Sequence, residues 1–141
     1  MALRRLRGVR YIPRMAIQRE ITVKLANSPG SLSRISHLLG GERINMLAMS
    51  IEPTGLLRLV VDNPLHAINT LREQHYSVEE RDVLYTVMSN EPGSLSRALR
   101  LLGEAGINIE YAYASGIDRV PMVGVVIAVA DAQKASYIAG I

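Results

Sequence analysis

The chain has 141 residues, which is enough for one ordinary domain or for two small ones that stabilise each other. Hydrophobic residues make up 48% and charged residues 21%, an ordinary balance for a globular protein. Phe, Trp and Cys are absent, so the core must be aliphatic, and disulfides and thiolate sites are excluded. We expect no cofactor, because neither a GxGxxG nor a GxxxxGK[ST] nucleotide loop occurs.

The net charge of +3 depends on the first fourteen residues, which hold five arginines and no acid. The remaining 11 basic and 13 acidic side chains give the rest of the chain a charge of −2. Three interpretations of this basic extension, residues 1–18, stay open. The first is a flexible arm that binds nucleic acid or membrane, and the second is a targeting sequence. The third is an incidental extension, with the natural start near Met15. Because the rest of the chain is acidic, we do not expect it to bind nucleic acid. Only the five N-terminal arginines favour such binding.

The longest apolar stretch, Pro121 to Ala130, has only the length of a strand, so we expect no membrane span. No apolar segment of the signal-peptide type follows the basic residues. Together with the absence of Cys, these features are compatible with a cytoplasmic location, which we expect.

An internal repeat organises the chain. A shift of 63 residues aligns 27–45 with 90–108 without a gap, and 12 of the 19 positions are identical. Chance would give roughly one identity, so the chain contains a duplicated unit. We expect one domain at 19–82 and a second at 83–141.

Each unit predicts the same order of elements. In the first unit β-branched alternation, a helical stripe and turn residues indicate strand, helix, strand, strand, helix, strand. Asp62 or Asn63 caps the second helix, and Pro64 stands near its first position. The expected elements cover residues 20–26, 31 to the glycines at 40–41, 44–51, 56–62, 64 onward, and about 76–82.

The second unit predicts a strand at 84–89, a helix at 94–105, strands at 108–117 and 122–129, and a last helix opened by Asp131. Only ten residues follow Asp131, so the fourth strand of this unit is missing. We therefore expect Leu84–Ser89 to be an open sheet edge unless another segment covers it. The alternatives are that residues 8–12 or a partner chain pairs with this edge, or that the gene is truncated.

Strands and helices in this order give an α+β fold, a ferredoxin-like βαββαβ sandwich in two tandem copies, the second lacking its last strand. Each unit of about sixty residues is marginal alone, so the two should pack together or with a second chain.

The turn motif in both copies, N-x-P-G-S-L-S-R, resembles that of the ACT domain, a regulatory amino-acid-binding module. It stands at Asn27–Arg34 and Asn90–Arg97, and Ile-Asn follows the helix in each copy at 44–45 and 107–108. Over roughly residues 19–140 the chain resembles small stand-alone proteins made of two ACT domains.

This resemblance implies that domains pair side by side and that small effectors, often amino acids, bind where paired domains meet. The contacting groups would come from the strand-to-helix turn and from the start of the second strand. The implied ligand-binding residues are Asn27, Ser28, Pro29, Gly30, Ser31, Leu32, Asn45 and Met46, and then Asn90, Glu91, Pro92, Gly93, Ser94, Leu95, Asn108 and Ile109.

The chemistry of the turns agrees with this implication. Backbone N–H groups at a helix N-terminus attract carboxylates, and Gly allows a ligand to approach the backbone. The turns differ where Ser28 is neutral and Glu91 is negative. We hypothesise that Glu91 meets a ligand ammonium or weakens carboxylate binding in that copy. The same residues could also serve only as turn and helix cap, and one copy could be scaffold.

No catalytic or metal-binding arrangement is expected. His37, His66 and His75 lack metal-ligand spacing and should be solvated, and residues 79–82 suggest an exposed strand edge. Tyr111 and Tyr113 share a strand face, where they line an inter-domain groove or pack against a neighbour.

Two functions follow from these features. The first is a regulatory protein that binds a small effector, such as an amino acid, forms a homo-oligomer and acts on a regulated enzyme. The second is a scaffold without ligand; an enzyme of unrecognised type would need a titratable cluster that the sequence does not offer.

Overall fold

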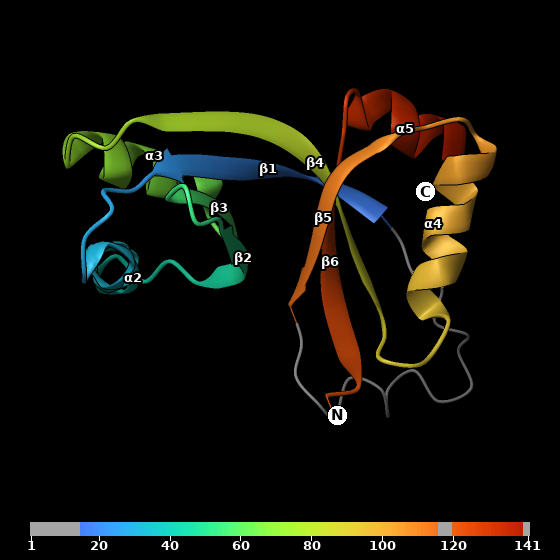
Figure 1. Ribbon diagram of the computed structural model, residues 1–141, viewed down its shortest axis with the longest axis horizontal. Helices are drawn as coiled ribbons and strands as arrows, with labels where there is room; N and C mark the ends of the chain where they lie inside the picture. The colour runs from blue at the N-terminus through green and yellow to red at the C-terminus, as the bar shows by residue number, and fades with distance from the viewer. Residues whose placement is uncertain (1–14, 116–119, 140–141) are drawn as a thin grey trace. The chain divides into compact units, whose positions relative to one another are not determined.

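A computed structural model describes residues 15–115 and 120–139 of the chain (Figure 1). The basic segment 1–14 and the loop 116–119 lie outside the described residues, and so does the segment 8–12 that was considered as an added strand. The described elements, in chain order, are β1 Met15–Lys24, α2 Ser31–Gly41, β2 Met46–Ile51, β3 Leu56–Val61, α3 Pro64–Glu73, β4 Val78–Ser89, α4 Ser94–Glu104, β5 Ile109–Ser115, β6 Met122–Val129 and α5 Ala132–Ala139.

The strands form a six-stranded sheet in the order β2-β3-β1-β4-β6-β5. The chain divides into two compact units, one formed by residues 18–83 and one by residues 84–139 together with 15–17 of β1. Strands β1 and β4 therefore contribute to both units. The α+β fold of two tandem ferredoxin-like units is confirmed.

The unit of residues 18–83 has an aliphatic core on one face of its strands. β3 pairs antiparallel with β1, Ile21 opposite Leu59, and with β2, Met49 also opposite Leu59. Side chains from α2 and α3, among them Ile35 and Leu71, complete the core and are fully buried. Both helices thus cover the same face of the sheet. Their N-termini lie at the ends of the strands, where turns connect strand to helix.

The unit of residues 84–139 repeats this plan. β6 pairs antiparallel with β4, Leu84 opposite Ile127, and with β5. Leu102 of α4 and Ala135 of α5 pack with these strands in a second core, and Ile17 of β1 packs against it. Each unit therefore has its own core.

β4, which contains Leu84–Ser89, lies between β1 and β6 in the sheet, so it is not an edge strand and the alternative of cover by another segment applies. β1 begins at Met15, five residues before the expected strand, and its residues 15–17 belong to the second unit. The start of β1 therefore stands beside β4, where the missing fourth strand of the second unit was expected.

The acidic residues of β4 likewise do not lie on a sheet edge. Arg19 of β1 forms an ion pair with Glu80, and its Nε lies 3.0 Å from a carboxylate oxygen of Asp82. These partners raise the pKa of the Arg19 guanidinium. The acidic cluster at 79–82, which the sequence predicted to be an exposed strand edge, is thus paired with a charge on the neighbouring strand.

Candidate functional site

The first N-x-P-G-S-L turn joins β1 to α2 and is held by its serines. Gly30 adopts a left-handed conformation, with φ of 85°, as the residue before α2. The buried Ser31 hydroxyl donates to the carbonyl oxygen of Ala26 at 2.9 Å and lies 3.1 Å from the Ser28 hydroxyl. The turn is therefore fixed by its own side chains, and Gly meets the need for positive φ.

A pocket of about 290 Å³ opens between this turn and the hairpin that joins β2 to β3. We call it the α2 pocket. Five of the predicted ligand-binding residues line it, and Pro29 lies in the same turn. The lining residues are Leu25, Ala26, Asn27, Ser28, Gly30, Ser31, Leu32, Ser33, Ile51, Glu52, Pro53 and Gly55.

The N-terminus of α2 supplies the hydrogen-bond donors of this pocket. Among the described residues, no side chain caps the helix, and its first turn contains no acid. The first N–H groups of a helix have no partner inside the helix, and the helix dipole makes this end positive. The backbone at Leu32 and Ser33 therefore offers donors to an anionic group.

Glu52 gives the same pocket a negative wall. Its carboxylate forms an ion pair with Arg58 of β3, whose side chain is 15% exposed. The hydrogen bond from Arg58 is the main reason why the pKa of Glu52 lies below its ordinary value. Glu52 is therefore ionised at neutral pH, opposite the positive end of α2.

The hairpin residues, including Glu52, were not predicted as part of the site. The repeat could not indicate them, because the corresponding loop of the second copy has a different sequence at residues 116–121. The turn Glu52-Pro53-Thr54-Gly55 was visible, but only the fold brings it beside Asn27.

The second turn, Asn90 to Leu95, joins β4 to α4 in the same way. Gly93 has φ of 86° and no side chain caps α4 in the described part of the chain. The Ser94 hydroxyl lies 2.9 Å from that of Ser89, and the Asn90 N–H donates to the carbonyl oxygen of Pro121. Glu91 is exposed in this turn.

The predicted residues at the start of each second strand do not lie near the turn of their own unit. Asn45 hydrogen-bonds Asp62, which follows β3, whereas the first turn lies at the hairpin before β3. Asn108 lies beside Ala130, which follows β6, whereas Asn90 bonds Pro121 before β6. Met46 and Ile109 begin β2 and β5 at the same ends as these asparagines.

The remaining candidates agree with their expected positions. Tyr111 and Tyr113 share a face and stack, with ring centroids 6.4 Å apart. His37, His66 and His75 are exposed, and His66 Nε2 lies 3.6 Å from Glu42. Within residues 15–115 and 120–139, no group of three or more His, Asp or Glu side chains could hold a metal ion. No described helix has the length and apolar character needed to cross a membrane.

Comparison with known proteins agrees with this fold. A family model described as ACT domain pair matches residues 15–137, and the chain belongs to this family. Comparison with curated proteins gives no match.

Several solved structures have the same fold. Protein BT0572 from Bacteroides thetaiotaomicron is 28% identical with a TM-score of 0.78, over 88% of this chain and 87% of that one. The regulatory subunit of aspartate kinase from Thermus flavus is 16% identical with a TM-score of 0.60, over 91% and 94%. E. coli aspartokinase III in complex with lysine and aspartate is 13% identical with a TM-score of 0.60, over 92% and 31%.

Proposed function

We propose that this protein is a regulatory protein without catalytic activity, which binds an amino acid in the α2 pocket. One observation carries the proposal: the uncapped N-terminus of α2 and the ionised Glu52 line the same pocket. These two features have opposite charge, which matches the two charged groups of a zwitterion.

The pocket supplies a partner for each of those groups. The ligand carboxylate would accept hydrogen bonds from the backbone N–H groups at Leu32 and Ser33. The ligand ammonium would meet Glu52, and the amide of Asn27 has both a donor and an acceptor to offer. Gly30, which carries no side chain, leaves the backbone open to a close approach.

The relatives support an amino acid as the effector. The ACT domain pair is a regulatory module, and the chain is similar over 91% of its length to a regulatory subunit of aspartate kinase. The E. coli aspartokinase III structure contains lysine and aspartate. We infer that the present chain binds an amino acid or a similar carboxylate as its effector and acts on a partner enzyme in the cytoplasm.

We further propose that a complete site needs two paired domains, supplied by two copies of the chain. Each turn lies at the opposite end of its unit from Asn45 or Asn108, so one unit cannot bring both to one ligand. Pairing of this kind makes the protein a homo-oligomer and gives Met46 and Ile109, which follow these asparagines, a place beside the ligand.

A thermal-shift screen of the twenty amino acids tests the proposal. Binding to the folded state raises the melting temperature, so one amino acid or a few related ones should do so. The same ligands should stabilise Ser28→Glu less, because that change puts the charge of Glu91 into the first turn. A melting temperature that none of the twenty changes would contradict the proposal and favour a scaffold.

The matched change Glu91→Ser tests the second turn. If Glu91 weakens carboxylate binding there, calorimetry should give a higher affinity or an additional binding event in this variant. Unchanged affinity and stoichiometry would show that Glu91 has no part in binding.

A further inference from the structure

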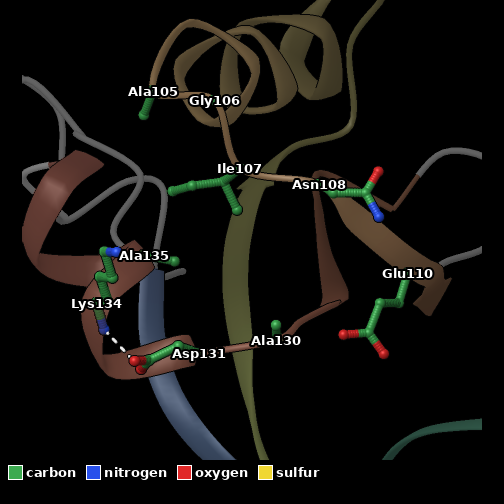
Figure 2. A pocket seen from close by; sticks show the side chains of 9 residues that line it. All are labelled: Ala105, Gly106, Ile107, Asn108, Glu110, Ala130, Asp131, Lys134 and Ala135. Atoms are coloured by element: carbon green, nitrogen blue, oxygen red, sulfur yellow. Dashed lines mark hydrogen bonds between the residues drawn. The ribbon is translucent and has the colours of Figure 1, made fainter.

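A second pocket, of about 340 Å³, lies at the other end of the second unit, away from its N-x-P-G-S-L turn. We call it the α5 pocket. It opens between the connection from α4 to β5 and the connection from β6 to α5 (Figure 2). Ala105, Gly106 and Asn108 line it from the first connection, Asp131 from the second, and Lys134 from α5.

At the same place in the first unit, backbone and side-chain groups bond one another. The Asn45 N–H donates to Oδ1 of Asp62 at 3.0 Å, and the Asp62 N–H donates to the carbonyl oxygen of Asn45 at 3.1 Å. Glu42, which ends α2, lies 3.6 Å from His66 of α3. The charged groups at this end of the first unit therefore have partners within the unit.

Equivalent positions follow from the hydrogen bonds that the two units share. Asn63 accepts from the His66 N–H, as Asp131 accepts from the Lys134 N–H, so Asp131 corresponds to Asn63 and Lys134 to His66. Ala130 then corresponds to Asp62. At the other wall, Ala105 and Gly106 end α4 as Glu42 and Arg43 end α2, and both Arg43 and Gly106 have positive φ.

Three charged residues of the first unit are thus replaced by Ala105, Gly106 and Ala130 in the second. The Ala130 side chain offers no acceptor to the Asn108 N–H, whereas Asp62 accepts from the Asn45 N–H. Ala105 likewise offers no carboxylate to Lys134, whereas Glu42 lies beside His66. Among the described residues the Lys134 ammonium has no ion-pair partner, although it lines the pocket. The replacements therefore put smaller side chains at this end and leave donors there without the partners that the first unit has.

The charges around this space have opposite signs on different walls. Figure 2 shows Lys134 on one side of the pocket and Asn108 and Glu110 on the other. Asp131 adds a carboxylate, one oxygen of which accepts the Lys134 N–H at 3.0 Å. An anionic group is favoured beside Lys134, and a cationic or hydrogen-bonding group beside the acidic residues.

We propose that the α5 pocket is a second effector site, separate from the α2 pocket, which takes a small zwitterion with its carboxylate on Lys134. Its volume is at the small end of the range for ligand sites, which suits a molecule of amino-acid size. The proposal rests on the contrast between the two units, and it holds whether or not the α2 pocket binds.

Amide NMR of the full chain, titrated with each of the twenty amino acids, separates the two sites. At least one amino acid should shift the amides of Asn108 and Ala135. The amides of Leu32 and Ser33 report on the α2 pocket independently. Because Asn108 also belongs to the proposed paired-domain site, Ala135 is the decisive reporter. Shifts at Leu32, Ser33 or Asn108 without Ala135, or none at either pocket, would overturn the second site, and shifts at Asn108 and Ala135 without Leu32 and Ser33 would support it while contradicting the α2 site.

Two variants then test the residues. Lys134→Gln should lower the affinity measured from the Ala135 shift by about tenfold, because it replaces a charged hydrogen bond by a neutral one. His66→Gln, at the equivalent position of the first unit, should leave this response unchanged. The triple variant Ala105→Glu, Gly106→Arg, Ala130→Asp introduces the charged residues of the first unit and should abolish it. An unchanged response in Lys134→Gln would contradict the proposal, even if the triple variant failed to fold.

Discussion

Leu25 and Gly55 meet at the rim of the α2 pocket so closely that position 55 has no room for a side chain. The N–H of Leu25 donates to the carbonyl oxygen of Gly55 at 2.8 Å. A Cβ at position 55 would lie 2.7 Å from the carbonyl oxygen of Leu25, and Gly55 has φ of +90°. The hairpin that carries Glu52 is therefore held against the end of β1 by a contact that only glycine allows.

We predict that Gly55→Ala lowers the free energy of unfolding by about 2 kcal/mol or more, because it adds backbone strain to a clash with backbone. Chemical denaturation measures the change. Gly40→Ala is the matched control, since position 40 is helical with no neighbour within 4 Å, and it should be neutral or stabilise slightly. Equal effects of the two changes would show that the hairpin contact is not what fixes the pocket.

Ser31→Ala should lower the free energy of unfolding by about 1 kcal/mol. The Ser31 hydroxyl is buried and bonds the carbonyl oxygens of Ala26 and Ser28, so its removal leaves acceptors without this donor. Ser33→Ala, an exposed change on the same helix, is the control. Urea denaturation of both variants gives the comparison, and an undiminished stability of Ser31→Ala would exclude this role.

Much of the fold could be predicted because local patterns repeat. The twin turns, the end of α2 at Gly41 and the cap at Asn63 with Pro64 behind it all appear where the sequence placed them. Each of these features depends on residues within a few positions of one another, so the sequence displays them directly.

The start of β1 could not be predicted, because its reasons lie far along the chain. Gln18 and Arg19 are polar or charged and do not suggest a strand, yet Arg19 pairs with residues 61 and 63 positions away. Pairing with β4 makes this segment a strand, and only the assembled sheet brings the two together.

The α5 pocket was missed for a related reason. Asn45 and Asn108 are 63 residues apart, whereas Asp62 and Ala130 are 68 apart, because the connection between the strands is longer in the second unit. The ungapped repeat stopped at the asparagines, so the exchange of Asp62 for Ala130 was not visible. An alignment that allows a gap in this connection would have found it.

The ion pair in the α2 pocket predicts a pH dependence. Arg58 lowers the pKa of Glu52 in the folded protein, so the pair stabilises the fold at pH values above the ordinary carboxyl pKa. This contribution is lost as the pH falls through the lowered pKa. Carboxyl NMR should give a pKa for Glu52 below the ordinary value, and the Arg58→Gln variant should raise it. The same value in both proteins would mean that Arg58 is not the cause.

Tyr85 and Gly124 give a test in the second unit. They lie on neighbouring strands, and a Cβ at position 124 would clash with the Tyr85 hydroxyl and ring. Gly124→Ala should therefore cost about 1–3 kcal/mol of the free energy of unfolding. Thermal or urea unfolding measures this cost, and adding Tyr85→Ala should remove most of the clash. A double variant whose loss is the sum of the two single losses would argue against this contact.

Calorimetric titration of the wild-type chain and of Glu52→Gln, with the amino acid that stabilises the wild type most, tests the central claim most directly. If the α2 pocket holds the ligand ammonium on Glu52, the wild type should bind saturably and Glu52→Gln should bind about tenfold more weakly. Glu73→Gln, an exposed change at the end of α3, should bind as the wild type does. Equal affinity in Glu52→Gln and the wild type, or no binding heat in either, would contradict the account.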